Sequence, residues 1–208
     1  MNQTAYRLYA ITDRSYLHGI SLAEAAEMAL AGGVTMLQLR EKQLDRQTLR
    51  QEILALQPLC RQYGVPLILD DDVMLALETG CNGVHVGQND MPASEARRLL
   101  GPGRILGVTA KTPAQARAAE EAGADYLGSG AMFTTSTKPE ARPMTPAQLR
   151  EITHSVQIPV VAIGGIGIGN ILQLQGTGIA GAAVSEGIFA AEDIRAAAAH
   201  LKEAALKL

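Results

Sequence analysis

The 208-residue sequence predicts an α/β fold in which one domain, residues 1–208, forms a single (β/α)8 TIM barrel. Three observations lead to this prediction: residues typical of helix starts, residues typical of helix ends, and short apolar runs alternate along the whole chain. The apolar runs lack the polar alternation of half-exposed strands, which is typical of parallel strands buried on both faces. We expect eight strands, at residues 6–12, 35–40, 66–70, 83–87, 105–110, 126–131, 159–164 and 181–186.

Glycine marks the predicted ends of the helices. Four glycines lie shortly before an apolar run, and glycine adopts the left-handed conformation that ends a helix at little steric cost. These are Gly33, Gly80, Gly123 and Gly178. A second group follows the apolar runs, at places where the backbone must approach a ligand closely. These are Gly87, Gly164, Gly165 and Gly187.

Capping residues mark the predicted starts of three helices. The capping-box spacing pairs Ser21 with Glu24, Thr112 with Gln115, and Thr145 with Gln148, and proline takes the first helical position in the last two. Residues 49–63 also have helical spacing, although Pro58 can kink or divide a helix there. The alternative fold is a doubly wound open sheet. Such a sheet usually carries a G-x-G-x-x-G motif or a P-loop after a strand, and neither follows a predicted strand here.

Charge and composition argue against several classes of function. Eighteen Lys and Arg residues against 21 Asp and Glu residues give a net charge of −3, and aromatic residues are few, so binding to nucleic acid is not expected. No apolar stretch approaches the roughly 20 residues that span a bilayer, and residues 1–14 do not resemble a signal peptide. Cys60 and Cys81 lack C-x-x-C spacing, which indicates reduced thiols in a cytoplasmic protein. Assembly into a homo-oligomer is left open.

Acidic residues follow the third and fourth predicted strands. In a (β/α)8 barrel the C-terminal ends of the strands form one face, and catalysis takes place there. Asp71 and Asp90 follow neighbouring strands and would make a site of hard oxygen ligands suited to Mg²⁺, which binds through one or two carboxylates plus substrate phosphates. The alternative is that residues 70–72 are only an acidic helix start favoured by the helix dipole.

Two candidate anion sites lie at the same face. Arg40 and Lys42 alternate with Glu41, so both cations can face one side and meet an anion, although a surface strip of ion pairs is the alternative. Residues 164–165 and 185–187 follow the last two strands, where barrels often bind a phosphate through backbone N–H groups. One substrate with a diphosphate and one with a monophosphate would fit. His85 lies inside a strand and is expected to be structural.

Several motifs in order along the chain resemble those of the thiamine-phosphate synthase family. They are residues 8–13 (LYAITD), 38–42 (QLREK), 71–73 (DDV), 83–88 (GVHVGQ), 90–92 (DMP), 135–138 (TSTK) and 163–166 (IGGI). The resemblance covers nearly the whole chain. It implies a (β/α)8 barrel that joins hydroxymethylpyrimidine diphosphate to a thiazole monophosphate, with Mg²⁺ as cofactor and diphosphate as the second product.

The resemblance also implies roles for particular residues. Lys138, Arg40 and Lys42 would be catalytic because they neutralise the departing diphosphate, and Asp71 and Asp90 would hold Mg²⁺. The implied substrate-binding set is Gln38, Arg40, Glu41, Lys42, Asp70, Thr109, Thr135, Ser136, Thr137, Lys138, Gly165, Ser185 and Glu186. Within it, Gln38, Arg40 and Lys42 would hold the pyrimidine diphosphate, and Gly165 with the Ser185–Glu186 turn would hold the thiazole phosphate.

Three positions depart from the family pattern. Asp70 stands where the family usually has Asn, Thr109 where it usually has Ser, and residues 185–188 read Ser-Glu-Gly-Ile instead of Val-Ser-Ala-Ile. A carboxylate aimed at a phosphate would repel it. Asp70 and Glu186 therefore motivate one alternative function, a non-catalytic sensor of a phosphorylated ligand. The other alternative is a related barrel, a thiazole tautomerase, which needs an acid/base pair instead of a metal and is disfavoured by the Arg40/Lys42 and Asp71/Asp90 sets.

Overall fold

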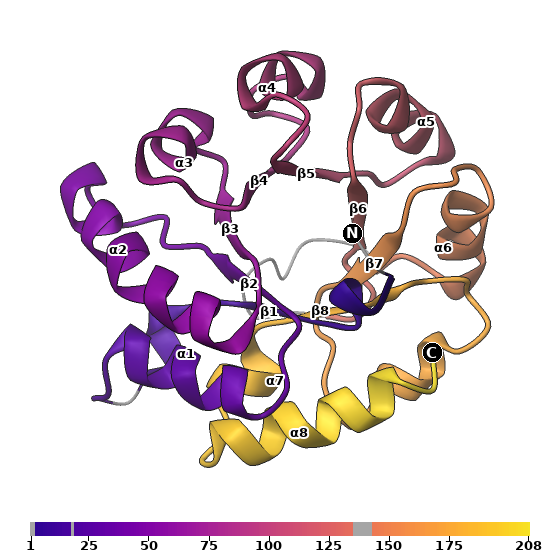
Figure 1. The fold of residues 1–208 in the computed structure, drawn as a ribbon. Helices are drawn as coiled ribbons and strands as arrows, with labels where there is room; N and C mark the ends of the chain where they lie inside the picture. The colour runs from indigo at the N-terminus through magenta and orange to yellow at the C-terminus, as the bar shows by residue number, and fades with distance from the viewer. Residues whose placement is uncertain (1–2, 18, 135–142) are drawn as a thin grey trace.

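The computed structural model describes residues 3–17, 19–134 and 143–208. Eight parallel strands pair in chain order, and the eighth pairs with the first, so the sheet closes into a barrel (Figure 1). The strands are β1 (Leu8–Ile11), β2 (Met36–Leu39), β3 (Leu67–Asp70), β4 (Gly83–Val86), β5 (Ile105–Thr109), β6 (Tyr126–Gly130), β7 (Val160–Ile163) and β8 (Gly181–Val184). Each strand lies within a predicted range. The (β/α)8 barrel is therefore confirmed, and the open sheet is excluded.

Helices form the outer ring around the strands (Figure 1). They are α1 (Leu22–Ala31), α2 (Arg46–Tyr63), α3 (Val73–Thr79), α4 (Ala93–Leu100), α5 (Pro113–Glu121), α6 (Pro146–Thr153), α7 (Glu186–Phe189) and α8 (Ile194–Ala205). Short 3₁₀ helices add η1 (Gln3–Tyr6), η2 (Arg14–Tyr16) and η3 (Ile171–Leu174). After β7 the described chain forms η3 in place of an α-helix, and after β8 it forms both α7 and α8. In the described part of the chain, no helix combines the length and the apolar character needed to cross a bilayer.

The helix boundaries follow the local signals in the sequence. The predicted capping boxes at α1 and α6 are both complete. The side chains of Ser21 and Thr145 each accept from a backbone N–H, and their own backbone N–H groups donate to the side chains of Glu24 and Gln148. At α5 the Thr112 side chain accepts from Gln115 N, but the Gln115 side chain bonds instead to Lys111 N, so that box is only half formed. The helix α2 continues through Pro58 as one element.

The four glycines predicted to end helices all have a left-handed backbone. Their φ angles are 98° at Gly33, 74° at Gly80, 88° at Gly123 and 79° at Gly178. Side chains other than glycine rarely adopt this conformation, and Gly33, Gly80 and Gly123 each lie within two residues of the end of an α-helix. For Gly178 the prediction of a helix end is wrong, because η3 already ends at Leu174 with Gln175 as its C-cap. The next strand then begins within a few residues.

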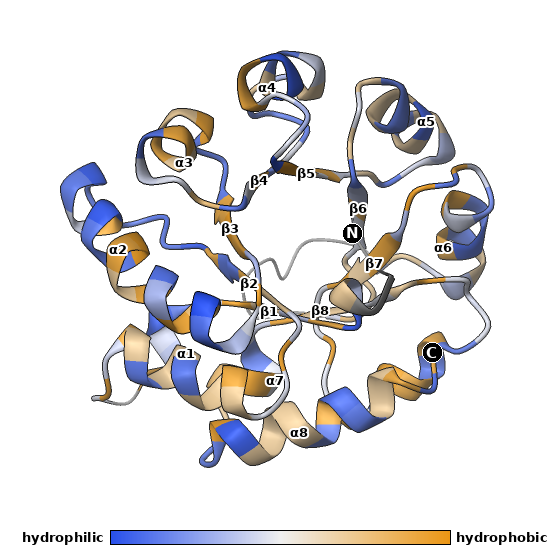
Figure 2. Ribbon diagram, in the orientation of Figure 1, coloured by the Kyte–Doolittle hydropathy of each residue, from blue (hydrophilic) through white to orange (hydrophobic). Residues whose placement is uncertain are grey.

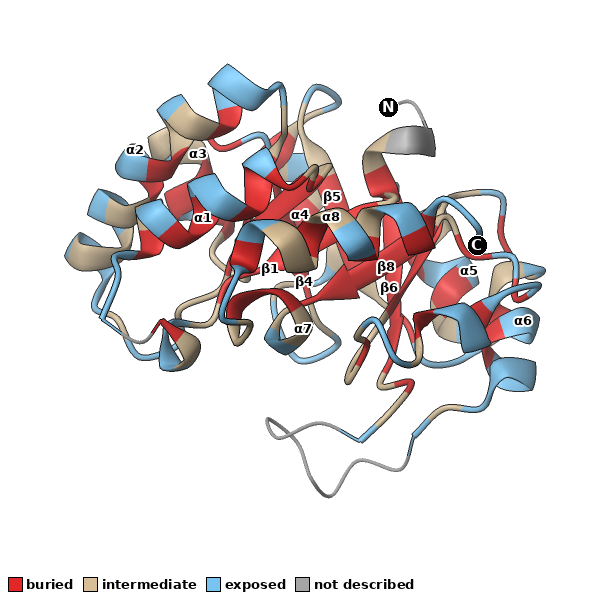
Figure 3. Cartoon of the chain, turned by 90° about the horizontal axis from the view of Figure 1, so that it is seen from below, coloured by how far each residue is buried: buried red, intermediate tan, exposed pale blue. Residues whose placement is uncertain are grey.

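The core has two parts because side chains alternate across each strand. On β1, Leu8 and Ala10 point outward into a large cluster shared with the helices, while Tyr9 and Ile11 point into the barrel. The strands are buried and the outer helix faces are exposed (Figure 3). Apolar and polar residues accordingly alternate along the helices, because each helix has one face toward the strands and one toward solvent (Figure 2). The barrel is thus a packed scaffold whose strand ends can hold side chains in fixed positions.

Candidate active site

A cavity of about 480 Å³ opens at the C-terminal ends of the strands, and all eight strands contribute to its lining. This is the face where the sequence placed the candidate site. Ten of the predicted residues line the cavity: Gln38, Arg40, Lys42, Asp70, Asp71, Asp90, Thr109, Gly165, Ser185 and Glu186. Residues that lie up to about 150 positions apart in the sequence therefore share one space. The other predicted residues Thr135, Ser136, Thr137 and Lys138 lie outside the described residues.

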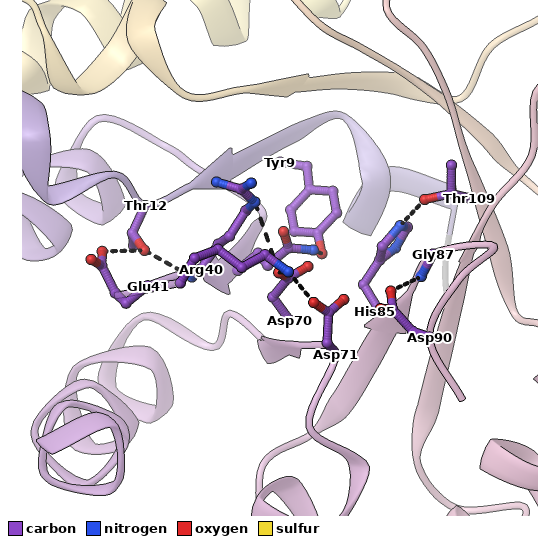
Figure 4. Close-up of polar contacts among 12 residues, drawn as sticks. Tyr9, Thr12, Arg40, Glu41, Asp70, Asp71, His85, Gly87, Asp90 and Thr109 are labelled. Carbon is purple, nitrogen blue, oxygen red and sulfur yellow. Dashed lines mark hydrogen bonds and ion pairs between the residues drawn. The ribbon is translucent and has the colours of Figure 1, made fainter. Parts of the chain in front are cut away.

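A group of basic and acidic side chains occupies one side of the cavity (Figure 4). Lys42 Nζ lies 2.8 Å from Asp70 Oδ2 and also contacts the Asp71 carboxylate. Arg40 Nε lies 3.8 Å from the same Asp70 oxygen. Although burial lowers the pKa of Lys42, its bonds to Asp70 and Asp71 outweigh that effect and raise the pKa, which keeps the ammonium charged. Two fixed cations thus face the cavity, with Asp70 between them.

The carboxyl groups of Asp71 and Asp90 interact directly at the ends of β3 and β4. Burial is the largest influence on Asp71; with the neighbouring Asp70 charge and the hydrogen bond to Asp90 it raises the pKa of Asp71 to about 6, against the opposing effect of Lys42. Partial burial of Asp90 is outweighed by hydrogen bonds from Asp71 and from Gly87 N, and the pKa of Asp90 is lowered. The Gly87 N–H donates to Asp90 Oδ2 at 2.7 Å. Asp71 therefore keeps its proton to a higher pH than Asp90 does.

The backbone at Asp71 adds to this arrangement. Asp71 has a φ of 62°, the only positive φ at a non-glycine residue within the described ranges. Aspartate tolerates the left-handed region better than most residues, at a cost of about 1–3 kcal/mol. Together with the interaction with Asp90, this backbone directs a carboxylate to the cavity at the start of the loop before α3. A backbone held in this way is common at ligand sites.

The donor set fits a divalent cation that is completed by substrate. No group of three or more His, Cys, Asp or Glu side chains arranged to hold a metal occurs among residues 3–17, 19–134 and 143–208. Two adjacent carboxylates at the cavity wall are nevertheless the set with which Mg²⁺ is usually held when substrate phosphates supply further oxygen ligands. Lys42 supplies positive charge beside Asp71 in this structure, and a divalent cation would supply it to both carboxylates when bound.

Glu41 is the predicted substrate-binding residue that does not line the cavity. Its side chain accepts a hydrogen bond from Thr12 Oγ1 at 3.1 Å (Figure 4). It accepts a second one from Arg14 Nε at 3.0 Å. Burial raises the pKa of Glu41, although the bonds from Arg14 and Thr12 oppose this. The alternation of the segment after β2 explains the difference, because consecutive side chains in extended backbone point to opposite sides.

Hydrogen-bonded polar side chains also cross the inside of the barrel. His85 lies within bonding distance of Tyr126 OH at Nδ1 and of Thr109 Oγ1 at Nε2, both at 3.0 Å. Burial lowers the pKa of His85 to about 4, against opposing effects of Asp70 and Asp90, so the ring is neutral near pH 7. The sequence alone did not identify Tyr9, Tyr126 or Thr12 as residues of the site. Only their spacing within apolar strands could have marked Tyr9 and Tyr126 as facing the interior.

The opposite side of the cavity is formed by the loops after β7 and β8. Gly165 has a φ of 64°, and a Cβ there would lie 2.9 Å from Phe133 Cβ, so glycine is required. Asn170 Nδ2 holds the Gly165 carbonyl at 2.8 Å. Among the described residues, Ser185 Oγ is a buried polar atom with no hydrogen-bond partner, which indicates a donor reserved for a ligand. Glu186 also lines this part of the cavity and is exposed.

The chain is similar to known proteins over nearly its whole length. Residues 8–188 match the family described as thiamine monophosphate synthase. The chain is 43% identical over 198 residues to the thiamine-phosphate synthase of Ruminiclostridium cellulolyticum, covering 95% of this chain and 94% of the relative. It is 46% identical to thiamine-phosphate synthase 2 of Streptococcus pneumoniae, covering 94% and 93%. The structure of a thiamine phosphate pyrophosphorylase from Pyrococcus furiosus superposes with a TM-score of 0.90 at 36% identity, covering 98% of this chain and 97% of that one.

Proposed function

Since the chain belongs to the thiamine monophosphate synthase family, its activity is the formation of thiamine phosphate, and we propose how the cavity performs it. The substrates are hydroxymethylpyrimidine diphosphate and a thiazole monophosphate, and diphosphate is released. The observation that carries the assignment of residues is the placement of Arg40 and Lys42 beside Asp71 and Asp90 at one wall of the cavity. This wall supplies both kinds of partner that a diphosphate and its metal require.

The pyrimidine diphosphate binds at this wall. Arg40 and Lys42 bind its phosphate oxygens through charge-assisted hydrogen bonds, and Lys42 then exchanges its contact with Asp70 for one with the substrate. Asp71 and Asp90 would hold Mg²⁺ here. When bound, the metal supplies positive charge that neutralises the diphosphate as it leaves.

The reaction itself requires little covalent chemistry from the protein. The bond between the pyrimidine methylene carbon and the diphosphate oxygen breaks, and the electron-rich aminopyrimidine ring stabilises the cation that remains. The thiazole nitrogen then attacks the methylene carbon and forms the new carbon–nitrogen bond. The task of the chain is to neutralise the leaving group with Arg40 and Lys42, and to hold the two rings in line. From its sequence motif, we propose that Lys138 also helps to neutralise the leaving group.

The thiazole phosphate binds at the opposite wall. The unpaired Ser185 hydroxyl and the glycine backbone at Gly165 provide uncharged donors for a phosphate monoester. Thr135, Ser136 and Thr137 are proposed to add hydroxyl donors, as their sequence motif implies. Two separate anion sites in one cavity fit two phosphorylated substrates, whereas an acid/base site for thiazole rearrangement would use neither the diphosphate wall nor a metal.

The test is turnover by the purified chain with both phosphorylated substrates, in Mg²⁺ and in excess chelator. We expect thiamine phosphate only with Mg²⁺. Asp90→Ala should abolish turnover while circular dichroism shows an intact fold, and Glu203→Gln, an exposed change on α8, should leave turnover unchanged. Full activity of Asp90→Ala would contradict the metal assignment.

The same experiment separates the two alternatives. Tight binding of thiazole phosphate without any product, measured by calorimetry, would support a sensor. Rearrangement of the thiazole alone, detected without the pyrimidine substrate, would support a tautomerase.

A further inference from the structure

Five polar side chains from five strands form one continuous chain of hydrogen bonds across the inside of the barrel. All of them except Tyr126 line the cavity. Gln38 Nε2 donates to Tyr9 OH at 2.7 Å, and Tyr9 OH lies 2.8 Å from Tyr126 OH. Tyr126 OH lies 3.0 Å from His85 Nδ1, and His85 Nε2 lies 3.0 Å from Thr109 Oγ1. Gln38 and both tyrosines are almost fully buried, at 0–3% exposure. The chain thus runs from a residue of the diphosphate wall to a hydroxyl on the cavity surface.

The residues around the chain leave space for it. A Cβ on Gly107 would overlap the Tyr126 phenol and would lie 2.5 Å from His85 Nδ1, and one on Gly128 would lie 3.0 Å from His85 Cε1. Apolar side chains such as Ile11, Met36 and Ile68 share the barrel interior with it. Polar groups in such surroundings are costly unless each one is paired, so the arrangement of the hydrogens is strongly constrained.

The direction of the chain follows from counting hydrogens. The Gln38 amide nitrogen can only donate, so Tyr9 accepts from it and passes its own single hydrogen to Tyr126. Tyr126 in turn has one hydrogen, and its remaining partner is His85 Nδ1, which must then be the unprotonated nitrogen. The neutral ring therefore carries its hydrogen on Nε2 and donates it to Thr109. In the opposite direction, the Tyr9 hydroxyl hydrogen would have no acceptor within the chain.

We infer that this chain is a positioning relay, which holds His85 as its Nε2–H tautomer and leaves the Thr109 hydroxyl to act as a hydrogen-bond donor toward the cavity. Because Thr109 Oγ1 already accepts from His85, its own hydrogen is the group available to a ligand. The role toward substrate rests on the proposed function, and the partner would be an acceptor atom of a bound substrate. Tyr9, Tyr126 and His85 act through Thr109 and do not themselves need to touch the substrate.

The tautomer is tested directly by long-range proton–nitrogen NMR on protein labelled with ¹⁵N-histidine. The His85 signals are assigned as those lost in His85→Gln, which separates them from His18, His154 and His200. We expect the Nε2–H pattern in the unaltered chain. In Gln38→Glu, the carboxylate can only accept, so every bond reverses and the Nδ1–H pattern is expected. The exposed Tyr63→Phe on α2 is the control and should keep the original pattern.

Two outcomes of the NMR experiment overturn the relay. One is the Nδ1–H pattern at His85 in the unaltered chain. The other is an unchanged tautomer in a folded Gln38→Glu. If the unaltered chain makes no thiamine phosphate, the proposed function fails, yet the tautomer measurement still decides whether the relay exists.

Kinetics test the role of the presented hydroxyl. Tyr126→Phe should lower kcat about ten-fold, as expected for the loss of one oriented hydrogen bond, with KM for the thiazole phosphate little changed. Thr109→Val should lose more activity than Thr109→Ser, which retains the hydroxyl. Equal kcat for Tyr126→Phe and the unaltered chain, or equal activity of the two Thr109 variants, would contradict the role.

Discussion

The hydroxyl of Thr12 donates a hydrogen bond of 3.1 Å to Glu41 Oε1 while it accepts one of 3.0 Å from the backbone N–H of Arg40. Thr12 is fully buried, and Arg14 holds the second oxygen of Glu41. Glu41 is therefore tied to the scaffold behind the strand end, and the same hydroxyl fixes the backbone from which the Arg40 side chain reaches the cavity. The position of the Arg40 backbone therefore depends on Thr12, which itself lines the cavity, and Thr12 is in turn held by Glu41, which does not line it.

Replacing Thr12 by valine tests this link. Thr12→Val keeps the side-chain volume. It leaves the Arg40 N–H without its acceptor and Glu41 Oε1 without its donor. We expect a loss of about 1–3 kcal/mol in the free energy of unfolding by urea. KM for the pyrimidine diphosphate should also rise several-fold. Thr12→Ser retains the hydroxyl and serves as the control; equal stability and KM in both variants would contradict the link.

Asp70 forms ion pairs with Arg40 and Lys42, the two cations that we propose bind the diphosphate. Its carboxylate pairs with Lys42 at 2.8 Å and with Arg40 at 3.8 Å. Asp70→Asn removes the competing charge and keeps the shape, so KM for the pyrimidine diphosphate should fall about three- to ten-fold, as expected for an ion pair of roughly 1 kcal/mol. Steady-state kinetics with the exposed Glu121→Gln as control measure this. A higher KM would show instead that the carboxylate assists binding.

Local signals in the sequence were sufficient to predict the barrel. The Ser21–Glu24 box and the left-handed Gly80 and Gly123 set helix boundaries through contacts within a few residues, and the structure confirms them. Eight such units of similar length then close in the one way that buries every strand on both faces. The fold was accessible because each signal acts locally and all of them agree.

The interior of the site depends on contacts that no local signal reveals. Tyr9 and Tyr126 meet across the barrel although 117 residues separate them, and only the strand register brings their hydroxyls together. The need for glycine at position 107 also arises from residues far away in the sequence, since a side chain there would overlap the rings of His85 on β4 and Tyr126 on β6. For Glu41 the signal was present: the alternation that directs Arg40 and Lys42 to the cavity directs the residue between them away.

Alkaline pH should destabilise the protein through the buried thiol of Cys60. Burial raises the pKa of this thiol to about 12, whereas the ordinary value is 9.0. Between these values the folded chain retains a proton that the unfolded chain has released. Stability is therefore fully present below about pH 9 and falls above it, by at most about 1.4 kcal/mol per pH unit for this group.

Urea unfolding of the unaltered chain and of Cys60→Ala from pH 8 to pH 10.5 measures this effect. Cys60→Ala should be less stable at pH 8 because it creates a cavity, yet its stability should decline less steeply above pH 9. Leu56→Ala, another fully buried position on α2, creates a cavity without removing a titrating group and should keep the steep decline. Parallel curves for the unaltered chain and Cys60→Ala would contradict the assignment.

The proposed metal site should depend on Gly87, which contacts Asp90 through its backbone alone. Its N–H donates to Asp90 Oδ2 at 2.7 Å, and a Cβ at this position would lie 2.8 Å from the same oxygen. In Gly87→Ala the flexible Asp90 side chain can move away while the backbone stays in place, so the melting temperature should change little. The Mg²⁺ concentration for half-maximal activity should rise at least ten-fold, as is usual when a group that orients a metal ligand is disturbed. Gly103→Ala, where an added Cβ meets open space, is the matched control. An unchanged Mg²⁺ requirement in Gly87→Ala would mean that the position of the Asp90 carboxylate does not control metal binding.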